Sequence, residues 1–214
     1  MTSSPTDKPH YVITVGRQFG SGGRELGRRL ADHLGIKYYD KELLKEAARK
    51  SGLNHEFFER SDERFPSFLS GLFSFALGYN SFNLYQGSST ISDESIYKAQ
   101  SDFIHELADT EPCVIVGRSA DYILRDRDNV VNIFVHAPAD ACARRVMERA
   151  ERGTEQEAKA LAEKTNKLRA NFYNFYTDKR WGDARSYDLT LDSSLMPLED
   201  IADFVIAYVR KRLG

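Results

Sequence analysis

The stretch Tyr11–Ala31, YVITVGRQFGSGGRELGRRLA, predicts a short apolar strand, then a glycine-rich loop, then a helix. Four glycines fall within the eight residues from Gly16 to Gly23. A loop that runs into a helix N-terminus exposes backbone N–H groups, and the helix dipole there favours an anion. Glycines let those amides approach a phosphate with no side chain in between. We therefore expect a phosphate-binding loop, with a ligand-free tight turn as the simpler alternative.

The loop fits the Walker A pattern, G-x-x-x-x-G-K-[ST], only in part. With Gly20 and Gly22 as the inner glycines, Arg17 replaces the first glycine. Gly23 then stands in the lysine position and Arg24 in the hydroxyl position. In this register the lysine that contacts the β- and γ-phosphates is missing, and so is the hydroxyl that holds Mg²⁺.

A second register starts from Gly16, with a longer loop, and leaves the same two groups missing. Arg24 then takes the place of the lysine and Glu25 that of the hydroxyl residue. Arginine keeps the positive charge, but its planar guanidinium is not equivalent to a compact ammonium. Arg24 is the cation that directly follows the loop glycines, whereas Arg17 lies on the strand side of the turn. We predict that Arg24 performs the task of the Walker lysine.

A dinucleotide-binding loop is the main alternative. Gly16, Gly20 and Gly22 fit the glycine spacing of short-chain dehydrogenases. Asp40 lies about twenty residues on, where an acid that binds ribose would lie. Hydride transfer in those enzymes also needs a Tyr-x-x-x-Lys pair, and none of the eleven tyrosines has a lysine four positions later. The arginines of the following helix suit a polyphosphate at least as well.

Length and composition favour one α/β domain over residues 10–214, preceded by a flexible arm, residues 1–9. The 41% hydrophobic and 12% aromatic content is typical of a globular protein. A net charge of −2 argues against a protein that coats nucleic acid, so no nucleic-acid partner is expected. Cys113 and Cys142 fall in an expected strand and helix, which predicts reduced core thiols in a cytoplasmic protein. No apolar run approaches the roughly 18 residues of a membrane span, so no membrane partner is expected.

Five short segments rich in Val, Ile and Tyr predict buried strands, and helical patterns separate them. The predicted strands are Tyr11–Val15, Lys37–Asp40, Cys113–Val116, Val130–Val135 and Tyr187–Leu191. The predicted helices are Gly23–Leu34, Lys41–Ser51, Glu94–Asp109, Ala139–Glu151 and Pro197–Arg212. This alternation predicts an α/β fold: a five-stranded parallel sheet sandwiched by helices.

Residues 54–93 interrupt the alternation and predict an inserted helical region. The first part is acidic, and Phe65–Tyr85 is dense in Phe, Leu, Gly and Ser. One interpretation is a helical hairpin that covers part of the core. The other is a mobile insert over a substrate or a homodimer surface, since exposed aromatic clusters need a partner. The sequence leaves both open.

Charge is unevenly distributed along the chain. Residues 54–111 carry three bases and ten acids, whereas residues 144–185 carry eleven bases and seven acids. A basic segment late in an acidic chain suits a lid over a polyphosphate, although a solvated helix face accounts for most such runs. Lys164, Lys167 and Arg169 do not all share one helical stripe.

The third predicted strand ends in a second chemical signal. Val114–Ser119 reads VIVGRS, which places Gly117 and Arg118 at the carboxyl end of a buried strand. Ligands of open α/β sheets bind at that edge. A guanidinium there can hold a phosphate or a nucleobase through two parallel hydrogen bonds. A structural salt bridge is the alternative.

Three stretches carry a resemblance to a known family: ITVGRQFGSGGRELGRRLADHLGIKYYDKELL, CVIVGRSADYIL and NFYNFYTDKRWGDARSYDLTLDSS. Together they resemble the cytidylate kinase-like family of P-loop kinases, from about Tyr11 to the C-terminus and most weakly within residues 54–93. The resemblance implies a P-loop kinase fold with a monophosphate-binding insert and a lid segment. It also implies transfer of the γ-phosphate of ATP to CMP, dCMP or a related small acceptor, with Mg²⁺.

The resemblance further implies roles for individual residues. The donor phosphates would be cradled by Gly20, Ser21, Gly22, Gly23 and Arg24. Asp40 and Arg118 would bind the acceptor nucleoside monophosphate. Lys167 and Arg169 resemble lid cations that neutralise the transferring phosphoryl group, so with Arg24 they are the expected catalytic residues. Such charge stabilisation matters because phosphoryl transfer depends mainly on positioning and electrostatics.

The chain also departs from the family pattern. Ser119 stands where cytidylate kinases have the aspartate of Gly-Arg-Asp, and Val116 and Asn166 stand where acids are expected. The sequence therefore identifies no metal ligands. A second interpretation is a non-catalytic, nucleotide-binding regulatory protein with a degenerate phosphate loop. Both interpretations predict nucleotide binding, and only the kinase predicts Mg²⁺-dependent turnover.

Overall fold

The structure is a computed structural model of the chain, and it describes residues 10–40, 43, 46, 50, 93–150 and 153–213. Within these residues, five strands form one sheet in the order β2-β3-β1-β4-β5. The strands are β1 (Val12–Arg17), β2 (Lys37–Tyr39), β3 (Cys113–Val116), β4 (Val130–His136) and β5 (Leu189–Asp192). All neighbouring pairs are parallel. The predicted five-stranded parallel sheet is confirmed.

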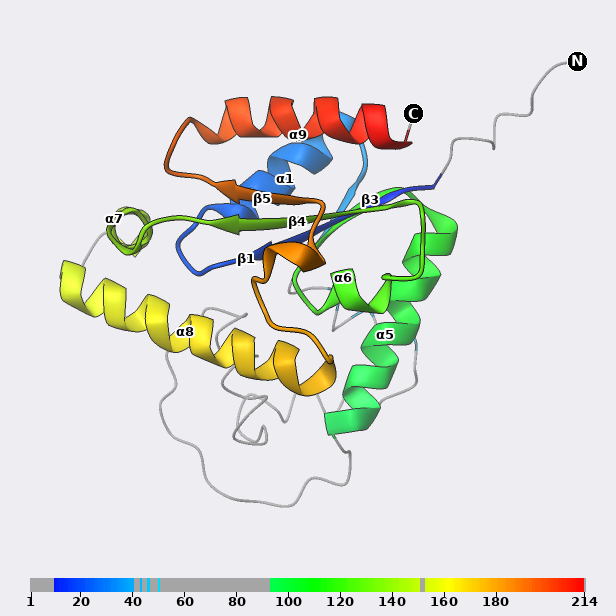
Figure 1. Cartoon of the computed structure of the whole chain (residues 1–214), viewed down its shortest axis with the longest axis horizontal. Helices are drawn as coiled ribbons and strands as arrows, with labels where there is room; N and C mark the ends of the chain where they lie inside the picture. Colours follow the sequence, from blue (N-terminus) through cyan, green and yellow to red (C-terminus); the bar gives the residue numbers. More distant parts are fainter. Residues whose placement is uncertain are drawn as a thin grey trace, which may run out of the picture.

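Helices cover both faces of this sheet (Figure 1). The described helices are α1 (Gly23–Leu34), α5 (Asp93–Thr110), α6 (Ala120–Ile123), α7 (Ala139–Ala150), α8 (Glu155–Tyr176) and α9 (Leu198–Leu213), with a 3₁₀ turn η1 (Ala184–Ser186). Figure 1 shows α1 and α9 on one side of the sheet and α5, α6 and α8 on the other. A parallel sheet needs this double cover because both of its faces are apolar.

Alternate residues of the central strand β1 pack into two separate cores. Ile13 and Val15 point to the face covered by α1 and α9, where they join residues such as Leu26 and Val205. Val12 points to the other face, into the core that includes Ile104 of α5. This period-two alternation is what a strand buried on both sides requires.

The register of the sheet brings the carboxyl ends of three strands to one edge. Val15 of β1 pairs with Val116 of β3 and with Ile133 of β4. The residues that follow these positions, among them Arg17 and Gly117, therefore meet at the same edge. Ligands of open α/β sheets bind at this edge.

The long helix α8 was not predicted. Residues 144–185 were interpreted as a basic lid segment, whereas a regular 22-residue helix occupies much of that range. Its buried positions include the small or polar residues Ala158, Ala162 and Thr165, so the sequence lacks the periodic pattern of large apolar residues that would predict a helix. One readable signal was present: Thr154 and Glu157 form a capping box at its N-terminus. Its action as a lid stays a prediction.

Several expectations fall partly or wholly outside the described residues. These are the arm at residues 1–9 and the insert at residues 54–93, of which only Asp93 is described, as the first residue of α5. In the predicted helix 41–51, the described residues Leu43, Glu46 and Lys50 are helical. Cys113 and Cys142 are buried thiols, as predicted, and burial raises the pKa of Cys113 to about 12. Among the described helices, none is long and apolar enough to cross a membrane.

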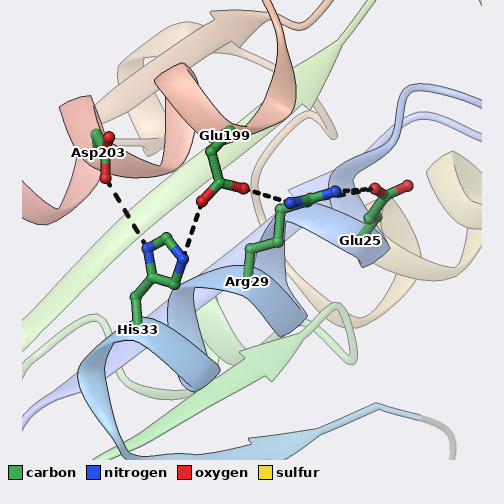
Figure 2. Close-up of polar contacts among 5 residues, drawn as sticks. All are labelled: Glu25, Arg29, His33, Glu199 and Asp203. Atoms are coloured by element: carbon green, nitrogen blue, oxygen red, sulfur yellow. Dashed lines mark hydrogen bonds and ion pairs between the residues drawn. The ribbon is translucent and has the colours of Figure 1, made fainter.

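Helices α1 and α9 are also joined by a polar network at the surface (Figure 2). Arg29 lies between Glu25, at 2.9 Å, and Glu199 of α9. His33 Nε2 lies 3.0 Å from Glu199, and its Nδ1 lies 3.9 Å from Asp203. These side chains are between 37% and 72% exposed. Exposed ion pairs add little to stability, so the apolar contacts beneath them hold α9 in place.

We predict that Leu26→Ala lowers the free energy of unfolding by about 2–5 kcal/mol, because Leu26 is fully buried between α1 and the sheet and its truncation leaves a cavity. Glu199→Gln, which breaks the surface network, should cause only a small fraction of that loss. Urea denaturation of both variants measures the comparison. A larger loss for Glu199→Gln would mean that the network, rather than the core, fixes α9.

Candidate functional site

The glycine-rich loop, Gln18–Gly22, joins the end of β1 to the start of α1. Gly22 is the N-cap of the helix, with φ of 80°, and Gly23 is the first helical residue. This placement agrees with the first of the two registers, in which Arg17 and Gly23 stand at the two ends of the loop. The predicted order of strand, loop and helix N-terminus is thus present in the structure.

Two glycines of the loop adopt a conformation that other residues rarely take. Gly20 and Gly22 have φ of 78° and 80°. A Cβ atom at Gly20 would lie 2.6 Å from the carbonyl oxygen of Cys142, so a side chain does not fit there. Among the described residues, no group accepts a hydrogen bond from the N–H of Gly20 or Gly22. These two amides are therefore available to an anion.

Side chains from distant elements hold the backbone of the loop. Arg145 of α7 donates to the carbonyl oxygen of Ser21 at 3.2 Å and to that of Ser193 at 2.6 Å. The N–H of Phe19 donates to Asn166 Oδ1 of α8 at 2.7 Å. Nothing in the sequence spacing of Arg145 shows that its side chain reaches the loop. The loop is thus fixed in shape before any ligand arrives.

Asp40 lies at the centre of the site, directly after β2. Its side chain is only 8% exposed. Arg24 Nε lies 2.6 Å from Asp40 Oδ2, and Arg17 Nη2 lies 3.7 Å from Asp40 Oδ1. Arg24 and Asp40, which the sequence suggested for donor and acceptor separately, are therefore in direct contact.

Arg169 reaches this cluster from α8. Its Nη1 donates to the carbonyl oxygen of Arg17 at 2.9 Å, and its guanidinium lies 5.7 Å from the centre of the Phe19 ring. Burial holds the pKa of Arg169 well below its usual value, and the positive charges of Arg17 and Arg118 lower it further, against the opposing effect of Asp40. Arg17 and Arg118 are thus each close enough to repel Arg169.

The structure does not bring Lys167 to the same place as Arg169. Lys167 is exposed, whereas Arg169 is partly buried. Two residues apart on a helix are rotated by roughly 200°, so the two side chains leave α8 on opposite sides. The predicted pair of lid cations is therefore one cation at the loop and one at the surface.

The turn after β3 is strained. Gly117, Arg118 and Ser119 have φ of 74°, 64° and 53°, in the left-handed region that non-glycine residues rarely adopt. Gln100 of α5 donates to the carbonyl oxygen of Arg118 at 2.9 Å and helps to hold the turn. Strain of this kind persists where the surroundings impose it, and it is typical of binding sites. This conformation was not predicted.

A buried hydrogen bond ties the strained turn to α8. The carboxylate of Asp121, two residues after the turn, accepts a hydrogen bond from the Tyr173 hydroxyl at 2.7 Å. Burial raises the pKa of Asp121, and the hydrogen bond from Tyr173 opposes that shift. Since α8 also carries Arg169, this contact fixes the position of Arg169 relative to Arg118.

We predict that Asp121→Asn removes part of the pH dependence of stability. The folded-state pKa of Asp121 is raised, so the folded state binds the proton more tightly and stability falls as pH rises from about 4 through that pKa. Asparagine keeps the acceptor for Tyr173 but carries no charge, so this decline should be absent. Urea denaturation between pH 4 and 8 measures it, and an unchanged pH profile would contradict the assigned burial.

Comparison with known proteins identifies the family of this chain. The profile of the Cytidylate kinase-like family matches residues 12–195. The chain belongs to the Cytidylate kinase-like family. It is 26% identical over 206 residues to a cytidylate kinase of Pyrococcus horikoshii, covering 96% of this chain and 90% of that protein. It is 27% identical over 184 residues to a cytidylate kinase of Pyrococcus furiosus, covering 86% and 80%.

Solved structures show the same fold. An uncharacterized protein from Eubacterium ventriosum is similar, with a TM-score of 0.70 and 29% identity over 95% of this chain and 100% of that one. A gluconokinase from Sinorhizobium meliloti gives a TM-score of 0.52 at 16% identity, covering 95% and 93%. A shikimate kinase from Acinetobacter baumannii gives 0.50 at 14%, covering 94% of each chain. The fold is that of the P-loop kinases.

Proposed function

We propose that this family member is a nucleotide kinase that transfers the γ-phosphate of ATP to CMP, dCMP or a related small acceptor. One observation carries the proposal: the amides of Gly20 and Gly22 face no described partner, and the guanidinium groups of Arg17, Arg24 and Arg169 gather around Asp40 and the end of β1, where the loop begins. Amides at a helix N-terminus and arginine side chains are the groups that bind phosphates. Family membership supports the same chemistry.

On the donor side, the loop amides would bind the phosphates of ATP. The residues proposed for this task are Gly20, Ser21, Gly22, Gly23 and Arg24. Hydrogen bonds from Arg145 and to Asn166 already fix the backbone of the loop, so little conformational freedom is lost when a phosphate binds. The Ser21 hydroxyl donates to the carbonyl oxygen of Gln18 at 2.9 Å, so Ser21 would contribute mainly through its backbone.

On the acceptor side, Asp40 and Arg118 would bind the nucleoside monophosphate. Both lie at the carboxyl edge of the sheet, after β2 and β3. Arg118 lies near enough to Arg169 to lower its pKa, and two such guanidinium groups would suit a dianionic phosphate. Asp40 would accept hydrogen bonds from the sugar or base while it keeps Arg24 in place.

Charge stabilisation of the transferring phosphoryl group is proposed for Arg24, Arg169 and Lys167. Arg169 already contacts the loop through Arg17 and is held by α8. Lys167, exposed on the far side of α8, would contribute through its longer-range field rather than through contact. Preorganised cations of this kind lower the barrier without moving during the reaction.

The site fits the phosphates of ATP better than it fits a protein-bound Mg²⁺. Among the described residues, no three His, Cys, Asp or Glu side chains gather in a way that could hold a metal ion. Asp40, the carboxylate within the site, is already paired with Arg24 and Arg17. Mg²⁺ would enter with ATP and keep several waters.

A binding protein without turnover is the second candidate, and the Arg24–Asp40 contact favours it. At 2.6 Å this pair directs the Arg24 guanidinium toward β2, so Arg24 must turn to reach the terminal phosphates. A protein that only binds nucleotides would need no such movement. Cytoplasmic location, the exact acceptor and a homodimer remain predictions from the sequence.

We predict that Arg118→Asn weakens binding of CMP at least tenfold and leaves binding of ATP nearly unchanged. Asparagine tolerates the left-handed backbone at this position, and the loss of one charge-assisted hydrogen bond costs about 1.5–3 kcal/mol. Isothermal titration calorimetry with each nucleotide measures the two affinities. An equal loss for ATP would place Arg118 on the donor side.

We predict that Arg24→Ala lowers turnover at least a hundredfold, since removal of one charge that stabilises the transferring phosphoryl group costs about 3 kcal/mol. Arg24→Lys should retain more activity than Arg24→Ala. The assay follows ADP release with ATP, Mg²⁺ and a panel of monophosphates. Arg185→Ala is the control, because Arg185 is 89% exposed and pairs with Asp183.

Two outcomes of this assay would decide against the proposal. Undiminished turnover by Arg24→Ala would remove Arg24 from the catalytic residues. Absence of turnover by the wild-type protein with every monophosphate, while ATP still binds, would favour the binding protein.

A further inference from the structure

The side chain of Arg17 occupies the space that a Walker lysine would need. Arg17 is the last residue of β1, and its side chain is 20% exposed. A Cβ atom built on Gly23 would lie 2.5 Å from Arg17 Cβ and 3.2 Å from Arg17 Cγ. No residue with a side chain fits at Gly23 while Arg17 is present. The two departures from the Walker A pattern therefore depend on each other: Arg17 in the position of the first glycine requires Gly23 in the position of the lysine.

A second glycine is fitted to the same side chain. A Cβ atom on Gly117 would lie 2.0 Å from Arg17 Nη1 and 2.9 Å from its Cζ. The guanidinium of Arg17 thus lies against the strained turn that carries Arg118, between the ends of β1 and β3. Gly23 packs against the stem of Arg17 and Gly117 against its charged head. The charge of Arg17 therefore lies at the edge of the sheet where the glycine-rich loop and the turn Gly117–Ser119 meet.

The charge of Arg17 is only partly balanced by the described residues. Its ion pair is with Asp40 at 3.7 Å, a carboxylate that Arg24 approaches more closely, at 2.6 Å. Arg169 adds a second partly buried cation, which contacts the carbonyl oxygen of Arg17. Burial lowers the pKa of Arg17, and Asp40 opposes that shift. A partly buried guanidinium that shares its carboxylate gains from an anion that can neutralise it.

We infer that Arg17 is the phosphate-binding cation of this loop and contacts the terminal phosphates of the donor from the strand side. The position of the Walker lysine is then occupied by Gly23. The inference deepens the proposed function and rests on it for the identity of the ligand. Arg24 and Arg17 then have different tasks. In the structure Arg24 is paired with Asp40 on the acceptor side, whereas Arg17 lies at the end of β1, beside the loop.

The first test uses inorganic tripolyphosphate, which carries the phosphates without the nucleoside, and isothermal titration calorimetry. Arg17→Met keeps the aliphatic stem against Gly23 and removes the charge, and we expect binding to weaken about tenfold to a hundredfold. Arg17→Lys should weaken it less. Arg185→Met, which removes an exposed charge elsewhere, should bind as the wild type does. Circular dichroism melts confirm that each variant is folded.

The second test exchanges the two positions. Gly23→Lys alone should lose tripolyphosphate binding, because its Cβ meets the stem of Arg17. Arg17→Gly alone should lose it through the missing charge. The double variant Arg17→Gly/Gly23→Lys removes the contact with Arg17 and supplies a cation. The Cβ of Val135, 3.1 Å from the new Cβ, is then the remaining close neighbour and has to yield by only a few tenths of an ångström, so the double variant should bind at least tenfold more tightly than Arg17→Gly. This recovery is a gain of affinity, which a variant that fails to fold cannot mimic.

Three results would overturn the inference: wild-type affinity in Arg17→Met, no recovery in the double variant, or no binding of tripolyphosphate by the wild-type protein. Failure of the proposed function is read separately. In that case Arg17→Met still weakens tripolyphosphate binding, but the wild-type protein transfers no phosphate to any monophosphate.

Discussion

The guanidinium of Arg17, held at the carboxyl end of the central strand, constrains most of the site around it. Gly23 must be a glycine because the Arg17 stem fills the space of a side chain there, whereas Gly117, whose φ of 74° itself favours glycine, lies against the Arg17 guanidinium. Asp40 lies within ion-pair distance of it, and Arg169 binds its carbonyl oxygen. Three segments far apart in the sequence therefore meet on one residue, and the parallel register of β1 and β3 makes that meeting possible.

The fold and the place of the glycine-rich loop could be predicted from the sequence because their signals are local. Apolar runs such as Cys113–Val116 mark strands buried on both faces, and the glycines from Gly20 to Gly23 mark a loop at a helix N-terminus. Both features depend on residues close together in the chain. Helix α8 escaped prediction since its buried face is built from small residues such as Ala158 and Ala162, which carry little periodic signal.

The arrangement of the site could be predicted only in part, because it depends on contacts between distant residues. Asp40, Arg118 and Arg169 were expected near a phosphate, but nothing in the sequence places Arg24 on Asp40 or Arg145 on the backbone of Ser21. Lys167 and Arg169 look equivalent as neighbouring cations, and only the rotation of α8 separates them. Charge alone in a sequence says which groups attract, not which of them the fold brings together.

Helix α8 links the two halves of the site, and this has a consequence for how they respond to ligands. Its Asn166 and Arg169 contact the backbone of Phe19 and Arg17. Tyr173, one turn further along α8, donates a hydrogen bond to Asp121, beside the strained turn Gly117–Ser119. A displacement of α8 would therefore alter the phosphate loop and the setting of Arg118 together. Coupling of this kind needs a rigid element that touches both sites, and a continuous helix with contacts at Asn166, Arg169 and Tyr173 meets that requirement. Helix α8 thus joins the glycine-rich loop to the turn after β3 through its packing, independently of whether it also closes over a bound nucleotide.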